Sequence, residues 1–178
     1  MMKNPIYFAH ISDTHILPDE NSILHGGNPN LSAKRLLRKL KQLEKYISFV
    51  VHTGDIVADP CEESFRIASE IFDQINVPKY FVNGNHDSAE GLTRHLTFGQ
   101  HVRLLPDKLC YSFKIGNFSA LVLDGKIEGE KTAQGFIDQS QLDCLRTMLQ
   151  QEQHVTIFTH YPPLPLDSEC NASPVNGI

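Results

Sequence analysis

The sequence has no long hydrophobic run. No stretch reaches the roughly 18 apolar residues of a membrane-spanning helix, and the first residues, MMKNPIYFAHIS, contain no apolar run of signal-peptide length. We therefore expect a cytoplasmic protein with no membrane partner. Closely spaced cysteines are absent as well. No CxxC pair occurs, so neither a zinc knuckle nor a redox motif is indicated by the widely separated Cys61, Cys110, Cys144 and Cys170.

Basic residues are scattered, and the net charge is −5. One denser basic stretch, residues 34–41, falls in a segment of helical periodicity, where a solvated helix face explains it better than a nucleic-acid footprint. We therefore do not expect a nucleic-acid partner. The 178 residues, 40% of them apolar, suffice for a sizeable core, because single domains commonly have about 100–200 residues. No repeat or linker stands out, and we expect one domain over residues 1–178.

Short runs of β-branched and aromatic residues alternate with longer segments of helical periodicity, which is typical of an α/β fold built from βαβ units. The short runs predict strands over residues 6–12, 47–53, 79–82, 110–115, 118–123 and 155–159. The periodic segments predict helices over residues 31–46, 60–75, 88–98 and 138–151. Pro60 fits the first turn of its helix, and Gly116 with Asn117 fits a tight hairpin turn.

Polar clusters directly follow four of the predicted strands. They are Asp13 with His15, Gly54 with Asp55, residues 84–87 (GNHD), and His160. Ligand sites of open α/β sheets lie at this edge, beyond the carboxyl ends of the strands. A single cluster of this kind is usually turn chemistry, but four of them, all with side chains that can bind metals, are hard to explain as turns. We therefore predict one shared site.

The side chains in these clusters offer carboxylate oxygens, amide oxygens and imidazole nitrogens but no thiolates. Such a set suits Mn, Fe or Zn ions in a catalytic site. Residues two apart in a strand point the same way, so Asp13 and His15 could reach one ion together, and Asp55 could bridge two. Two ions about 3.5–4 Å apart would polarise a phosphoryl group and hold a hydroxide in line with phosphorus. Gly54 and Gly84 would let the backbone approach the ions closely, where a Cβ would obstruct it.

Four motifs, in this order, resemble those of the calcineurin-like metallophosphoesterase superfamily: SDTH at 12–15, TGDIV at 53–57, NGNHD at 83–87 and FTHYPP at 158–163. Within the superfamily, the chain is most similar to the bacterial class III cyclic-nucleotide phosphodiesterases and their glycerophosphodiesterase relatives. This likeness rests on AHISDTH at the start, LDG at 123–125 and the HYPPLPL run at 160–166. The resemblance implies two facing mixed β-sheets flanked by helices, in four layers.

The resemblance also implies a role for each motif residue. The implied ligands are Asp13 and His15 for a first metal ion, Asp55 as the bridge, and Asn85 and His160 for a second ion. His86 would lie near the leaving group as a proton donor or oxyanion stabiliser, without binding metal. The implied reaction is hydrolysis of a small phosphodiester by a hydroxide that bridges the ions. A 3′,5′-cyclic nucleotide such as cyclic AMP is the first substrate candidate, and glycerophosphodiesters or other small diesters and monoesters are the alternatives.

Two features depart from the family pattern. Tyr161 stands where relatives often have a second histidine, and no GHxH motif follows the HYPP segment. The last residues, YPPLPLDSECNASPVNGI, contain four prolines and no periodicity, so we expect the C-terminal part of the fold to be missing. Exposed strand edges would then favour homo-oligomers. A non-catalytic scaffold or an inactive fragment is therefore the alternative to an active enzyme.

Other polar residues have less specific interpretations. His10 and His52 lie inside predicted strands and are expected to be structural, and Asp124 is expected to belong to a structural loop. Asp87 is either a helix N-cap or a partner that orients a metal ligand. His25 is expected at the surface, where it could face the substrate across the HGGNPN loop.

Overall fold

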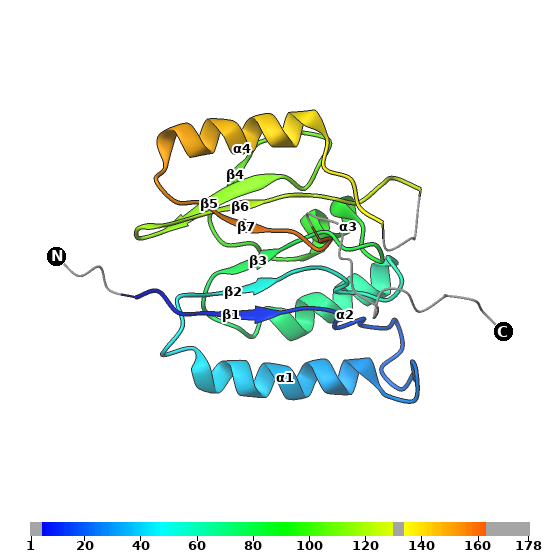
Figure 1. Ribbon diagram of the computed structural model, residues 1–178. Helices are drawn as coiled ribbons and strands as arrows, with labels where there is room; N and C mark the ends of the chain where they lie inside the picture. The colour runs from blue at the N-terminus through cyan, green and yellow to red at the C-terminus, as the bar shows by residue number, and fades with distance from the viewer. Residues whose placement is uncertain (1–4, 130–133, 163–178) are drawn as a thin grey trace, which may run out of the picture.

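The structure is a computed structural model that describes residues 5–129 and 134–162, and its elements form four layers (Figure 1). The strands are β1 (Phe8–Ile11), β2 (Phe49–His52), β3 (Lys79–Phe81), β4 (Val102–Arg103), β5 (Tyr111–Ile115), β6 (Phe118–Val122) and β7 (Thr156–Phe158). The helices are α1 (Pro29–Leu43), α2 (Glu62–Phe72), α3 (Ala89–His95) and α4 (Gln139–Gln151). None of these helices is long and apolar enough to cross a membrane. The predictions for residues 163–178, including Cys170, lie outside the described ranges.

The first sheet is parallel, with the strand order β1-β2-β3, and α1 and α2 cover its outer face. Its central strand, β2, is buried at every residue, which explains the uninterrupted apolar run FVV. The α1 helix turns Ala33, Leu37 and Leu40 inward, at the spacing of one helix face. Asn28 caps this helix, because its side-chain oxygen accepts a hydrogen bond from the Leu31 amide at 2.8 Å.

The second sheet has the strand order β4-β5-β6-β7 and mixes antiparallel with parallel pairs. Gly116 and Asn117 join β5 to β6 as predicted, with Gly116 in a left-handed conformation (φ +56°). The β4 strand was not predicted, because its residues Val102 and Arg103 are both exposed and form no apolar run. The α4 helix lies on the outer face of this sheet (Figure 1).

Aromatic side chains fill the space between the two sheets. Tyr80 of β3 stacks on Phe113 of β5 with 3.5 Å between ring centroids, and Phe8 of β1 meets Phe158 of β7 edge-on at 5.8 Å. Phe49 of the central strand contacts Phe113 at 5.4 Å. The sheets therefore face each other with helices outside, which confirms the predicted α/β fold of two facing sheets. The second sheet is mixed, whereas the first is parallel throughout its described strands.

The predicted elements are all present, and each is shorter than predicted, although α1 begins two residues earlier than predicted. The strands β1, β2 and β3 each end one residue earlier than predicted, where the chain turns into a loop of the candidate site. The prediction for Pro60 is wrong, because the proline lies before α2 and not in its first turn. Cys61 at the N-cap position has an extended backbone (φ −99°, ψ 160°), so the helix cannot include the residue before it.

Candidate metal centre

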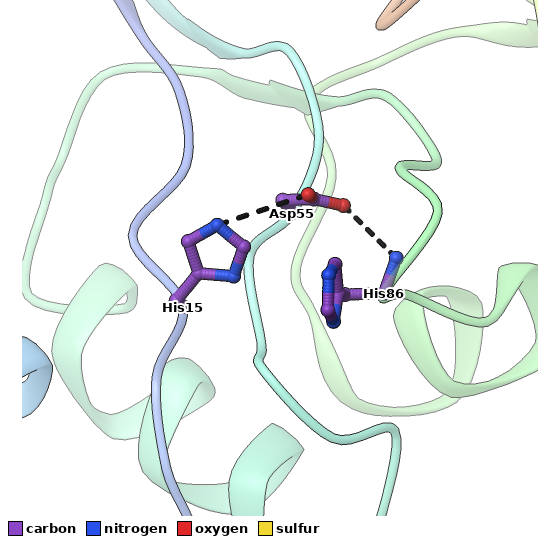
Figure 2. A group of neighbouring side chains, drawn as sticks. All are labelled: His15, Asp55 and His86. Atoms are coloured by element: carbon purple, nitrogen blue, oxygen red, sulfur yellow. Dashed lines mark hydrogen bonds and ion pairs between the residues drawn. The ribbon is translucent and has the colours of Figure 1, made fainter. Parts of the chain in front are cut away.

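Asp55 lies at the centre of the candidate site, on the loop that follows β2. Its Oδ2 is 3.8 Å from His15 Nε2 and 3.6 Å from His160 Nε2. Its Oδ1 accepts a hydrogen bond from the backbone amide of His86 at 3.0 Å. Figure 2 shows Asp55 flanked by His15 and His86, which come from the loops after β1 and β3. Segments far apart in the sequence therefore meet at this carboxylate, as the sequence predicts.

Two groups of possible ligand atoms overlap at Asp55. One group is His15, Asp55 and His86, the other is Asp13, Asp55 and His160, and within each the atoms lie within 4.8 Å of one another. Asn85 joins the second group, since its Oδ1 is 3.1 Å from His160 Nε2. The grouping differs from the implied one, because Asp13 stands with His160 and because His86 takes part. His15 Nε2 is also 3.7 Å from Asp13 Oδ1, so both pairings are within reach, and the ligand assignment stays a prediction.

Backbone carbonyls fix the tautomers of two of these histidines. His86 Nδ1 lies 2.9 Å from the Ala58 carbonyl oxygen, and His160 Nδ1 lies 2.8 Å from that of Thr53. Because a carbonyl only accepts, Nδ1 carries the proton in each ring, and a neutral ring then has its lone pair on Nε2. The Nε2 lone pair of His160 thus faces the side-chain amide oxygen (Oδ1) of Asn85. Two acceptors that converge in this way suit a cation between them.

The distances around Asp55 also fit a shared cation. Separations of 3.6 Å to His160 and 3.8 Å to His15 are too long for hydrogen bonds. Two ligand atoms that each lie about 2.0–2.2 Å from one ion stand about 3–4 Å apart, as these do. Asp55 is only 4% exposed, so its carboxylate needs a positive partner. The donor set of carboxylates, imidazoles and one amide therefore fits divalent metal ions.

Left-handed backbone conformations place the candidate ligands. Asp13 (φ +56°), His15 (φ +44°) and Asp55 (φ +54°) all adopt a conformation that is costly for a residue other than glycine. Gly54 and Gly84 lie close to two of the candidate ligands, and their predicted close approach to metal ions stays a prediction. A Cβ on Gly54 would lie 2.6 Å from His160 Nδ1, and one on Gly84 would lie 2.2 Å from Asp55 Oδ1.

Asp87 ties two loops of the site together. Its buried carboxylate accepts hydrogen bonds from the amides of Val57 and Gly84, each at 3.0 Å. Burial raises the pKa of Asp87 to about 6, and the backbone hydrogen bonds oppose this shift. The N-cap of α3 is Ser88, whose side chain accepts from the Gly91 amide, so the N-cap alternative for Asp87 is wrong. Asp87 therefore positions the loops that carry Asp55 and Asn85.

Other residues with structural predictions behave as expected. His52 is buried, with its Nε2 2.9 Å from the Thr14 hydroxyl, and His10 Nε2 is 2.8 Å from the Thr53 hydroxyl. Asp124 is buried, and its carboxylate accepts hydrogen bonds from backbone and side-chain donors, among them the Leu109 amide at 2.9 Å. None of these three residues belongs to either group of possible metal ligands found in the described ranges.

Lys126 and Tyr161 were not predicted to lie at the site. The Lys126 ammonium donates to the Asp87 carbonyl oxygen and lines a cavity of about 250 Å³ together with His86. Tyr161, in place of the second histidine of relatives, is 6% exposed and packs against Gly135. Burial raises the pKa of Tyr161 to about 12, so its phenol stays neutral. Lys126 follows the LDG segment and belongs to no motif, so its position at the site could not be predicted from the sequence.

Fold and site together define an α/β protein with two facing sheets and a candidate metal centre at the carboxyl ends of their strands. The family model of the calcineurin-like phosphoesterases matches residues 6–174, and the chain belongs to this family. Membership implies divalent metal ions, in agreement with the donor set described above.

Curated relatives match most of this chain but only part of their own length. A 3′,5′-cyclic-nucleotide phosphodiesterase of Nostoc sp. is 27% identical over 93% of this chain and 60% of the relative. The 3′,5′-cyclic adenosine monophosphate phosphodiesterase CpdA of Haemophilus influenzae is 28% identical over 93% and 59%. The glycerophosphodiester phosphodiesterase GpdQ of Enterobacter lignolyticus is 25% identical over 89% and 57%. The chain thus spans about three fifths of the length of these relatives.

Proposed function

We propose that this protein is a metal-dependent phosphodiesterase and that a 3′,5′-cyclic nucleotide is its substrate. The observation that carries the proposal is the convergence of two groups of metal-binding side chains on Asp55. The names of the relatives from Nostoc and Haemophilus influenzae support a cyclic nucleotide, and that of GpdQ makes a glycerophosphodiester the second candidate. A cytoplasmic location and self-association stay predictions.

In the proposed mechanism, the residues around Asp55 hold the ions and the phosphoryl group. Asp13, His15, Asp55, Asn85 and His160 would be the ligands, with Asp55 shared because it belongs to both groups. When bound, two ions supply Lewis-acid polarisation of the phosphoryl oxygens and lower the pKa of the attacking water. The left-handed backbone at Asp13, His15 and Asp55 orients these ligands before substrate arrives.

His86 is proposed to stabilise the leaving oxygen. Its Nδ1 proton is engaged by the Ala58 carbonyl, so a proton for the leaving group has to come from Nε2. Only the imidazolium form carries protons on both nitrogens. In this proposal the Ala58 carbonyl orients the ring, and Nε2–H donates to the departing alkoxide.

The experiment is a direct assay of the purified protein with added Mn. Cyclic AMP, a glycerophosphodiester and a bis-aryl phosphate are compared by kcat/KM, and we expect the highest value for cyclic AMP. The variant Asp55→Asn is the control, because it keeps the shape of the side chain but removes the charge that both groups share. We expect Asp55→Asn to lose both activity and metal. Absence of turnover with every diester would overturn the proposal.

Elemental analysis separates the enzyme from a non-catalytic scaffold of the same fold. The proposal predicts close to two transition-metal ions per chain, and a scaffold predicts little bound metal. The presence of all five proposed ligands within one cluster favours the enzyme. A metal-free protein that binds no added Mn would favour the scaffold.

A further inference from the structure

A cavity of about 470 Å³ opens directly beside the candidate metal centre. Asp13 and His15 form one side of it, and the loop and helix start over residues 24–36 form the other. Cavities of this size hold small organic ligands in many proteins. A group attached to a phosphoryl oxygen at the metal centre would therefore find room here.

His25, which lines this cavity, shares an unusual backbone with the candidate ligands. Over the described ranges, the non-glycine residues with positive φ are Asp13, His15, Asp55 and His25. Three of the four belong to the candidate metal centre, and His25 (φ +48°) faces the cavity next to it. Strained backbone conformations concentrate at functional sites, and this one lies within the same small region.

The local turn alone does not explain a histidine at this position. Leu24 and Gly27 exchange backbone hydrogen bonds at 2.8 and 3.0 Å, and His25 and Gly26 between them both have positive φ. Two such residues define a type I′ turn, which is most often built from asparagine, aspartate and glycine. Asparagine would close this turn equally well. The conformation of the turn therefore does not account for the imidazole of His25, and another role is needed to explain it.

On the side formed by residues 24–36 the cavity wall is largely apolar, and Ser32 contributes a single hydroxyl there. Leu24, Pro29 and Leu36 line it, and the carboxamide of Asn28 is occupied by the Leu31 amide and the Glu20 carbonyl. A polyol such as glycerol would leave hydroxyl groups against this apolar surface. A nucleobase, in contrast, has flat apolar faces that stack on imidazole rings and a few polar edges.

We propose that this cavity binds the nucleobase of the substrate and that His25 stacks on the base and so determines specificity. The inference rests on the proposed phosphodiesterase function and names its substrate class as a nucleotide. His25 lines the same cavity as Asp13 and His15, so a base stacked there would leave the phosphoryl group beside the candidate ligands.

The test is the variant His25→Asn, which preserves the type I′ turn and removes only the imidazole. Its selectivity is measured as the ratio of kcat/KM for cyclic AMP to that for glycerophosphoethanolamine, a diester without a base. We expect this ratio to fall about tenfold, through a higher KM for cyclic AMP, because stacking of one base on an aromatic ring contributes on this scale. The matched control is His154→Asn, since His154 is an exposed histidine outside the cavity.

A binding measurement keeps this inference separate from the proposed function. Adenosine has no phosphate, so its affinity, measured by titration calorimetry, does not depend on hydrolysis. We expect His25→Asn to weaken adenosine binding about tenfold and His154→Asn to leave it unchanged. Equal selectivity ratios in wild type and His25→Asn, or equal adenosine affinities, would overturn the inference even if diesters are hydrolysed. Loss of all hydrolysis with adenosine still bound through His25 would instead overturn the phosphodiesterase proposal alone.

Discussion

Gly84 lies so close to Asp55 that neither residue can change independently. A Cβ built on Gly84 would be 2.2 Å from both the amide nitrogen and the Oδ1 of Asp55, far inside any real contact. Because one of these atoms belongs to the backbone, a side-chain rotation cannot relieve the clash. The Asp55 carboxylate therefore keeps its place between the two groups of candidate ligands only while residue 84 is glycine.

The variant Gly84→Ala is expected to lose metal binding. Displacement of Asp55 removes the one carboxylate that both groups share, and the occupancy of transition metal should fall by at least tenfold. Elemental analysis after dialysis against dilute Mn measures this directly. The control is Gly116→Ala, which is also left-handed (φ +56°) but has its nearest neighbour, Ile6 Cδ1, at 3.8 Å. The Gly116→Ala variant should lose about 1 kcal/mol of folding stability and keep its metal. Equal metal content in the two variants would contradict this explanation.

His86→Asn distinguishes a catalytic role from metal ligation at this position. As a proton donor, His86 contributes to the transition state and not to the metal site, so we expect kcat to fall about 10²- to 10⁴-fold at unchanged metal content. The structure also places the ring in a group with His15 and Asp55, which leaves ligation as the competing explanation. Steady-state kinetics with elemental analysis of the same sample measures both quantities. Loss of one ion per chain would show that His86 is a ligand.

The meeting of distant motifs at one edge could be predicted from the sequence. Asp55 and Asn85 follow β2 and β3, which are buried at every residue and end at the same edge of the parallel sheet, and His160 follows β7, which runs parallel to β6 in the second sheet. The strands themselves could be recognised because β2, buried on both faces, has an unbroken apolar sequence. The β4 strand could not, since an exposed pair of residues has no such pattern.

The way in which Asp13 and His15 approach each other could not be predicted. The argument from strand alternation requires an extended backbone, but β1 ends at Ile11, and both residues are left-handed. Their polar atoms nevertheless lie 3.7 Å apart, in a loop that continues beside the loop after β2 as far as the parallel bridge between Ile16 and Val57. Such conformations depend on tertiary hydrogen bonds, here from the Asp13 amide to Gly54 and from the His15 amide to Asp55. These hydrogen-bond partners are distant in the sequence, so the residues around Asp13 and His15 do not predict the left-handed conformations.

Tyr111→Phe should destabilise the fold without affecting the site. The buried Tyr111 hydroxyl donates to the Phe81 carbonyl at 2.8 Å and accepts from the Phe81 amide at 3.0 Å, so it satisfies both backbone groups at the edge of β3. Removing it leaves two buried polar groups without partners, which costs about 1–3 kcal/mol. Urea denaturation measures the loss. The control Tyr46→Phe, at a residue that is 64% exposed, should change stability by less than about 0.5 kcal/mol. Similar effects of the two substitutions would show that the Tyr111 hydrogen bonds contribute little.

His52 should make the protein sensitive to acid. Burial lowers the pKa of His52 to about 3, and nearby His160 and His10 lower it further. An unfolded histidine has a pKa of about 6.5, so between pH 6.5 and pH 3 the unfolded chain binds a proton that the folded chain does not. Folding stability from this group is therefore complete above pH 6.5 and is lost progressively as the pH falls through this window. The expected loss is about 2 kcal/mol between pH 6.5 and pH 5.

The variant His52→Gln tests this, because its carboxamide can still donate to the Thr14 hydroxyl, as His52 Nε2 does at 2.9 Å, but cannot take up a proton. We expect the variant to be less stable than wild type at pH 7, owing to imperfect packing against Phe72, and to lose less stability on acidification. Urea denaturation of both proteins from pH 7 to pH 5 gives the difference. The control His154→Gln removes an exposed histidine, whose solvation is similar in both states, and should leave the slope as in wild type. Parallel curves for wild type and His52→Gln would mean that another group controls acid unfolding.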